Sequence, residues 1–446
     1  MKLLDPLFRA GECRAVFSDA AALQCMLDFE AALAHAEAAV GVIPSDAIDP
    51  IAAACHAELY DLDAIAHDAA RAGNLAIPMV KHLTARVKDT DASAARYVHW
   101  GATSQDAIDT GFVLQLKRAL AVVEADLQRL IAALAHRTTE HRHTVMVGRT
   151  WMQHALPTTL GLKLAGTLDA LLRHKQRLTE LTPRVLALQF GGAAGTLASL
   201  GDAGMQVAER LAEQLQLVLP ATPWHGQRDR VAEVAAWFGS LAGTLGKLAR
   251  DVSLLMQTEV GELAEPVGAG RGGSSTMPHK RNPVSSAVVL AAAQRVPALV
   301  GTVFSAMVQE HERGLGGWHA EWEVLPELIQ LSAGALSVSA ELVEGLEVHP
   351  DAMRANLDAT GGLIMAEAVT MALGEALGRL DAHKLVEEKC RQAQAEGRHL
   401  KTVLAEEPKI TMHLSTAELE HLLDPVNYTG VADTLIGRVL AAVEGD

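Results

Sequence analysis

The longest regular pattern in the chain is helical. From Val113, apolar residues recur at alternating spacings of three and four, at Leu116, Leu120, Val123, Leu127, Leu130 and Leu134. This spacing puts them on one narrow stripe of an α-helix, which packs against other helices at a shallow angle. Similar long stretches with few prolines cover 157–182, 230–262, 283–311 and 321–346. The pattern predicts a bundle of five long helices, which need apolar partners along their whole length.

The two ends of the chain differ from its centre. Before about residue 110, shorter helical stretches such as 21–40 alternate with breaks at glycine and proline. After about residue 350, shorter helices return around Gly361–Gly362 and a turn at Pro425–Asn427. We expect an all-α, three-part fold. Its predicted parts are an N-terminal helical domain (1–110), a central long-helix bundle (111–350) and a C-terminal helical domain (351–446).

Composition narrows the class of protein. Of the 446 residues, 49% are apolar but only 4% are aromatic, which argues against an all-β sandwich or barrel. The net charge of −16 argues against nucleic acid or an anionic membrane as partners. Uncharged stretches such as Val296–Gln309 are shorter than the ~18 residues of a membrane span. The four cysteines have no metal-ligand spacing and suit a reducing compartment. We therefore expect a cytoplasmic protein.

The most unusual stretch is GAGRGGSSTMPHKRNP, residues 268–283. Four glycines in six positions predict a mobile loop, followed by two serines and Lys280. Asn282 and Pro283 are good residues for a helix start, as N-cap and first helical residue. A helix start alone does not explain paired serines followed by a lysine.

The segment GSSTMPHKRNP resembles the signature loop of the fumarase/aspartase superfamily, and two further motifs fit the same family. The resemblance covers the whole chain. It implies a reversible addition or elimination beside a carboxylate, with no metal and no cofactor. It also implies a homotetramer whose active sites combine residues from several subunits, and a small carboxylate substrate as the only ligand.

The first further motif is RYVHWGATSQD, residues 96–106. Thr103 or Ser104 predicts the N-cap of the first long helix, with Asp106 three residues after Thr103 as in a capping box. The resemblance makes this a substrate-binding region, in which Thr103, Ser104 and Gln105 hold a carboxylate and His99 lies alongside.

The second is GRTWMQHALPTT, residues 148–159, with Pro157 predicted near a helix start. A histidine here is, on its own, most simply a surface or core residue. The resemblance instead implies a second active-site region here. Its residues are Arg149, Thr150, Trp151, Gln153 and His154. Two charged stretches, around Arg228 and Arg313, are either further site walls or solvated faces.

The three motifs are all predicted at N-terminal ends of long helices, where free N–H groups and a partial positive charge attract anions. If these ends converge, they form a site for several carboxylates. The resemblance assigns catalytic roles to Ser274, Lys280, Asn282 and His154, with Ser275 and Met277 as further substrate contacts. Ser274 is the implied proton carrier, and Lys280 and Asn282 stabilise a dianion where charge collects.

Trp151 departs from many lyases of the family, which have histidine there to protonate the leaving group. Tryptophan exchanges no proton, so the site suits a leaving group that is itself a carboxylate, with a pKa of about 4. The reverse of such an elimination is lactone formation. The motifs resemble the branch that closes 3-carboxy-cis,cis-muconate, a tricarboxylate, to 4-carboxymuconolactone in the protocatechuate branch of the β-ketoadipate pathway. A sulfonate in place of one carboxylate would suit the same site.

Two alternatives stay open from the sequence. One is an adenylosuccinate lyase, whose loop is nearly the same but which carries histidine in place of Trp151. The other is a non-catalytic relative that kept only the scaffold, against which the intact Ser274, Lys280 and Asn282 argue.

Overall fold

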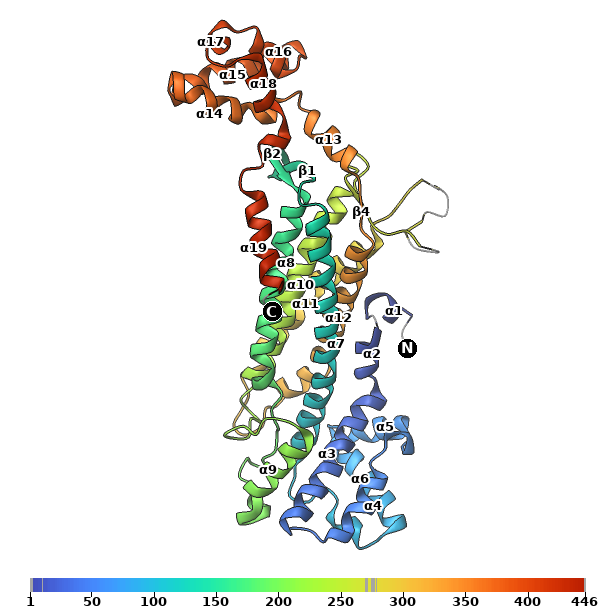
Figure 1. Cartoon of the computed structure of the whole chain (residues 1–446). Helices are drawn as coiled ribbons and strands as arrows, with labels where there is room; N and C mark the ends of the chain where they lie inside the picture. Colours follow the sequence, from blue (N-terminus) through green and yellow to red (C-terminus); the bar gives the residue numbers. More distant parts are fainter. Residues whose placement is uncertain (1–2, 10, 269–271, 274–276, 278, 445–446) are drawn as a thin grey trace. The chain divides into compact units, whose positions relative to one another are not determined.

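The computed structural model describes residues 3–9, 11–268, 272–273, 277 and 279–444 (Figure 1). Ser274 and Ser275 of the predicted site lie outside the described residues. The chain divides into two compact units. Unit 1 comprises 1–128, 174–246 and 288–338, and unit 2 comprises 129–173, 247–287 and 339–446.

The five predicted long helices are all present. They are α7 (Ser104–Glu140), α8 (Leu160–Val185), α10 (Asp229–Leu255), α11 (Val284–Ala306) and α12 (Gly317–Glu344). The apolar stripe predicted on α7 is buried at all seven of its positions, none more than 5% exposed. The boundary between the units falls within each of these helices, and successive helices cross it in opposite chain directions. The all-α prediction is therefore confirmed, with up-and-down connectivity.

Unit 1 also contains the helices of the N-terminal region and α9 from the middle of the chain. They are α1 (Asp5–Phe8), α2 (Gly11–Val16), α3 (Asp19–Val40), α4 (Ile48–Ala54), α5 (Leu62–Ala72), α6 (Ala76–Thr90) and α9 (Gly204–Leu215). Ser18 caps the start of α3, since its hydroxyl accepts the N–H of Ala21. Gly41, in the left-handed conformation, caps its end. These are the expected start and stop residues of a helix.

Unit 2 holds two small antiparallel sheets and the C-terminal helices. The first sheet pairs β1 (Val145–Thr150) with β2 (Gln153–Thr159), and the second pairs β3 (Leu263–Ala264) with β4 (Glu347–Val348). The helices are α13 (Pro350–Asp358), α14 (Ala366–Leu377), α15 (Arg379–Glu396), α16 (Leu400–Ala405), α17 (Pro408–Thr411), α18 (Thr416–Leu423) and α19 (Ala432–Glu444). Helices α14–α18 enclose one apolar cluster of their own, and Figure 1 shows them gathered together.

The predicted three-part division stays a prediction. Its first boundary, at 110, falls inside α7, and its second, at 350, falls at the start of α13. The compact units instead divide the long helices between them. The predicted parts are continuous stretches of sequence, whereas each compact unit combines several stretches, because each long helix contributes one end to each unit.

α11 is the most apolar of the long helices. By length and composition alone it is able to cross a membrane, yet only 28% of its most apolar window is buried within the chain. The uncharged stretch Val296–Gln309 covers only the second half of this helix, because Arg295 lies inside it.

Two glutamates lie buried on α3. Glu37 is fully buried, and neither of its carboxyl oxygens has a hydrogen-bond partner in the described part of the chain. Burial, reinforced by the charge of Glu30, raises the pKa of Glu37 to about 9. Glu37 is therefore neutral at pH 7, as expected for an unpaired carboxyl group away from water.

We expect Glu37→Gln to stabilise the protein in a pH-dependent way. The pKa of Glu37 is higher in the folded state, so its contribution to stability is complete below about pH 4.5 and is lost as pH rises towards 9. Glutamine does not titrate. Thermal unfolding should show little difference at pH 5 and a gain of about 2–4 °C at pH 8. Glu58→Gln, at an exposed position, is the control. An equal gain at both pH values would contradict the explanation.

Candidate active site

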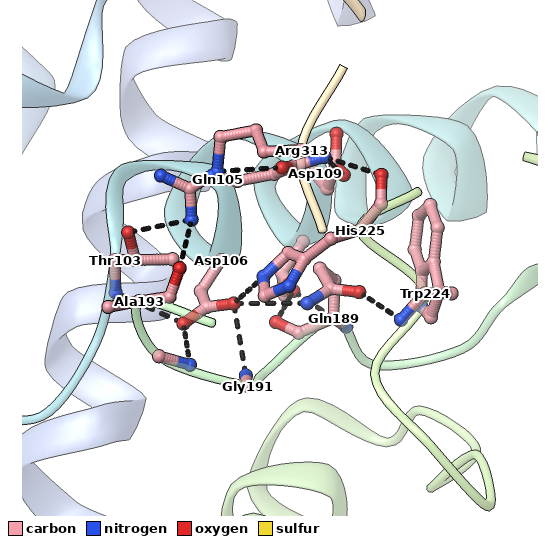
Figure 2. A network of polar contacts seen from close by, with 12 residues as sticks. Thr103, Gln105, Asp106, Asp109, Gln189, Gly191, Ala193, Trp224, His225 and Arg313 are labelled. Atoms are coloured by element: carbon pink, nitrogen blue, oxygen red, sulfur yellow. Dashed lines mark hydrogen bonds and ion pairs between the residues drawn. The ribbon is translucent and has the colours of Figure 1, made fainter. Parts of the chain in front are cut away.

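The first motif of unit 1 is built around Asp106, in the first turn of α7. Asp106 is fully buried, and its carboxylate accepts five hydrogen bonds of 2.9–3.1 Å. The donors are the backbone N–H groups of Thr103, Gly191 and Gly192 and the side chains of Gln189 and His225. Figure 2 shows these groups converging on the carboxylate. The Thr103 N–H bond is half of the predicted capping box, so the helix start at Thr103 is confirmed.

The network extends from Asp106 through Gln189 and Gln105. Gln189 links Asp106 to Trp224, because its amide N–H donates to the Asp106 carboxylate and its amide oxygen accepts the N–H of Trp224 at 2.7 Å. Gln105 is also fully buried and donates to Asp109 and to the carbonyl oxygen of His225, both at 3.0 Å. The polar atoms of Gln105 are thus occupied within the chain. Gln105 positions these neighbours, and the expectation that its amide holds a substrate carboxylate stays a prediction.

Arg313 completes the group in Figure 2. Its guanidinium donates to Gln105 Oε1 (3.2 Å), Thr103 Oγ1 (3.1 Å) and the carbonyl oxygen of Ala193 (3.2 Å). All three acceptors are neutral, and within the described residues Arg313 forms no ion pair. Arg313 is half-buried, so its charge is directed by hydrogen bonds but not neutralised. Such a guanidinium suits a carboxylate ligand.

Arg228 differs from Arg313 in its partners. It is buried and forms ion pairs with both Asp109 (2.7 Å) and Glu321 (2.5 Å), and it lies over the Trp224 ring. Burial alone would lower the pKa of Arg228, but the two carboxylates outweigh it and raise the pKa above its ordinary value. Its charge is fully compensated. Arg228 directly precedes α10 and links α7 to α12 within unit 1, and its predicted contact with substrate stays a prediction.

His99 has a charged partner that the sequence pattern did not indicate. Its Nδ1 lies 2.6 Å from Oε1 of Glu30 on α3. Burial alone would lower the pKa of His99, but the Glu30 carboxylate raises it above the ordinary value, with a smaller contribution from Asp106. His99 also has a positive φ of 57°. A non-glycine residue in this region marks a backbone held in place by its surroundings.

The second motif forms the β1–β2 hairpin in unit 2. Trp151 and Met152 are its tip, with φ values of 52° and 66°, and the Trp151 side chain is 98% exposed. Thr150, Gln153 and His154 beside the tip are exposed as well. A helix starts near Pro157, as predicted, but Pro157 itself is not part of it. Pro157 lies in β2 and α8 begins at Leu160, because Val145–Thr150 supplies a partner strand for this segment.

Arg149 anchors this hairpin. It makes a bidentate ion pair with Glu262, at 2.9 and 2.6 Å, and Asn356 donates to the same carboxylate at 2.8 Å. Glu262 is fully buried. Glu262 compensates the charge of Arg149 within unit 2, and the role of Arg149 in holding substrate stays a prediction.

In the third motif, a backbone hydrogen bond joins Gly272 to Asn282. The N–H of Asn282 donates to the carbonyl oxygen of Gly272 at 2.9 Å, and Gly272 has a φ of 72°. Met277 and Lys280 are exposed, and Lys280 forms no ion pair within the described residues. Arg281 instead pairs with Glu347 at 2.8 Å. Lys280 is thus the lysine whose charge stays available beside the loop.

The helix N-termini themselves are already occupied. At α11 the carboxylate of the buried Glu265 accepts the N–H groups of Ser285 and Ser286, at 2.8 and 2.7 Å. At α8 the first N–H groups donate to the carbonyl oxygens of Thr144 and His141. At α7 the Asp106 carboxylate accepts the N–H of Thr103, the residue before the helix. The first N–H groups of α8 and α11 thus have acceptors within unit 2, and the expectation that the three helix ends bind anions stays a prediction.

Within the described residues, no group of three histidine, cysteine or acidic side chains has the arrangement of a metal site. The first motif lies in unit 1 and the other two in unit 2. Their convergence into one site therefore stays a prediction.

Comparison with known proteins places the chain in a family. Residues 8–298 match the family model described as lyase, and residues 362–439 match the one described as adenylosuccinate lyase C-terminus. The chain belongs to the fumarase/aspartase superfamily of lyases.

Similar relatives span the whole chain. A 3-carboxy-cis,cis-muconate cycloisomerase of Pseudomonas aeruginosa is 60% identical over 99% of this chain and 96% of its own length. One of Bradyrhizobium diazoefficiens is 54% identical over 100% and 98%. The crystal structure of a 3-carboxy-cis,cis-muconate lactonizing enzyme of Pseudomonas putida superposes with a TM-score of 0.96 at 54% identity, covering 100% of this chain and 99% of that chain. The predicted superfamily fold is confirmed.

We expect Asp106→Asn to disrupt the first motif. Asparagine replaces one acceptor oxygen with an NH₂ group that faces N–H donors, and it leaves buried partners such as His225 unpaired. The cost should be about 3 kcal/mol. Thermal unfolding should show it, together with a large loss of activity. Asp63→Asn, at an exposed position in the same unit, is the control. Unchanged stability would mean that the network contributes little.

Proposed function

We propose that the protein is a 3-carboxy-cis,cis-muconate cycloisomerase that forms 4-carboxymuconolactone. The observation that carries the proposal is the identity of 60% and 54% to relatives of that name over nearly the whole chain. Trp151, where the sequence departs from many lyases, supports it independently. An enzyme whose elimination step releases a carboxylate needs no acid at that position.

The reaction is an isomerisation in which no atom is lost. A substrate carboxylate oxygen forms a C–O bond to a carbon of its own double bond, and a proton is added to the neighbouring carbon. Negative charge collects on the carboxylate beside the new C–H bond, as an aci-carboxylate, before protonation. We infer that Ser274 delivers this proton. We assign the stabilisation of this negative charge to Lys280 and Asn282, as the family resemblance implies.

The remaining carboxylates need separate positive partners. Arg313 is supported as one, because its partners are neutral and it is directed by Thr103 and Gln105. The exposed side chains of Thr150, Gln153 and His154 on the hairpin are further candidates, and so is Ser104, which is half-buried beside Thr103. Ser275 and Met277 are the further substrate contacts that the family resemblance implies. Trp151 offers an apolar, non-acidic wall.

We infer that the active form is a homotetramer in the cytoplasm, with active sites shared between copies. α11 supports self-association, because a helix of this apolarity with 28% of its window buried needs cover from other chains. The four cysteines are free, which suits a reducing compartment. The small tricarboxylate substrate is then the only ligand that the site requires, without metal or cofactor.

The activity is tested by the absorbance of 3-carboxy-cis,cis-muconate, whose conjugated diene absorbs in the ultraviolet and is lost in the lactone. We expect rapid decay with the purified protein and a fall of at least about 1,000-fold in kcat for Ser274→Ala. Lys280→Met should lower kcat by about 100-fold. Unchanged turnover by Ser274→Ala would mean that another group carries the proton.

The same protein should be incubated with adenylosuccinate, since the C-terminal segment matches an adenylosuccinate lyase model. We expect no AMP. Robust release of AMP would favour the lyase alternative over the cycloisomerase.

The oligomeric state is tested by light scattering on the eluting protein. We expect a particle of four times the mass of one chain. Ala298 is exposed on α11, and Ala298→Glu puts a charge on the surface that we propose to be covered. This variant should yield smaller particles and lower activity, because the sites are shared. Glu323→Gln, on an exposed position of α12, is the control. A tetramer that persists in Ala298→Glu would place the interface elsewhere.

A further inference from the structure

The contact between His99 and Glu30 is a buried ion pair next to the first motif. Glu30 lies on α3 and its side chain is 1% exposed, whereas that of His99 is 16% exposed. The backbone at His99 is held in the left-handed region, five residues before α7 begins. A strained backbone and a 2.6 Å hydrogen bond both fix the ring in one orientation.

Glu30 has no other cation in contact with it. Its second oxygen, Oε2, has no hydrogen-bond partner within the described residues. Glu37, seven residues further along the same face of α3, is neutral at pH 7 because burial raises its pKa to about 9. Among the described residues, the Asp106 carboxylate also acts on His99 and raises its pKa further. A buried carboxylate of this kind needs a positive partner, and the His99 ring is the one present.

The protonation state of His99 decides what its other nitrogen offers. With Nδ1–H bound to Glu30, a neutral ring would present a lone pair at Nε2, which repels a carboxylate. The imidazolium presents an N–H there instead, which donates a charge-assisted hydrogen bond. No residue in the described part of the chain pairs with Nε2.

We propose that Glu30 is a positioning residue that orients His99 and keeps it cationic, so that its Nε2–H donates to a carboxylate of the substrate. The inference rests on the proposed function, because it supplies a binding partner for one carboxylate of the muconate. It adds a residue from α3, in a region where no motif is visible. His99 contacts the substrate, and Glu30 acts only through His99.

The test compares Glu30→Gln with Glu37→Gln, which removes the other buried carboxyl group of α3 without touching His99. Glutamine at position 30 still accepts the Nδ1–H bond, so the ring stays in place while the charge is lost. The pKa of His99 should then fall, since burial alone lowers it. We expect KM for 3-carboxy-cis,cis-muconate to rise about tenfold at pH 8, with a much smaller change in kcat. The defect should diminish at pH 6, where the ring regains its proton.

Glu37→Gln should keep the KM of the wild type at both pH values. His99→Gln covers the case in which Glu30→Gln does not fold: its KM should be raised, and the steep part of its pH dependence should disappear. The double variant should be no worse than His99→Gln alone, because both changes remove one interaction. A KM defect in Glu30→Gln that is the same at pH 6 and pH 8 would indicate a merely structural role and overturn the proposal. So would a His99→Gln variant with the wild-type pH profile.

Binding of propane-1,2,3-tricarboxylate, measured by calorimetry at pH 6 and pH 8, separates this proposal from the proposed function. A wild-type protein that binds this anion but does not convert the muconate would contradict the cycloisomerase assignment alone. The Glu30→Gln affinity at pH 8 would still test the role of Glu30. Efficient turnover with anion binding that is insensitive to Glu30→Gln at both pH values would refute the role of Glu30 alone.

Discussion

A single buried negative charge at the start of α7 fixes the geometry of the first motif. A carboxylate with no exposure to water is costly unless every lone pair is satisfied. Asp106 meets this requirement with five donors from three separate stretches of the chain. Any displacement of those stretches would leave the charge uncompensated. The positions of Thr103 and, through Gln105, of Arg313 therefore follow from the solvation of Asp106.

The same constraint explains how a chain with a net charge of −16 presents positive groups. Most of the cations near the motifs are consumed by buried carboxylates: Arg228 by Asp109 and Glu321, and Arg149 by Glu262. Arg313 and Lys280 differ because no acidic partner reaches them within the described residues. A substrate with several carboxylates then competes with no internal anion at these two positions, whatever the overall charge of the protein.

The sequence was sufficient for the fold and for part of the site. A regular apolar stripe such as the one on α7 is a local signal, and so is the capping box of Thr103 and Asp106. The β1–β2 hairpin was missed because GRTWMQHALPTT has neither a tight-turn dipeptide nor clean alternation, and its pairing depends on φ values that Trp151 and Met152 rarely adopt. The partners of Arg149, Arg228 and His99 were missed for a different reason. Each lies 69 or more residues away in the sequence, and no local pattern marks it.

The anchored residues and the exposed ones alternate along the motifs. Arg149 is locked to Glu262 and directly precedes the exposed Thr150. Arg281 is locked to Glu347 and directly follows the exposed Lys280. An ion pair restrains the backbone of the residue next to it. The side chain of that next residue keeps its own hydrogen-bonding groups available. The desolvation cost falls on the buried Glu262 in the first pair, whereas Arg281 and Glu347 are each 37% exposed and lose little hydration. It follows that substitutions at the anchors should disturb binding by misplacing the exposed groups, even though the anchors themselves need not touch the substrate.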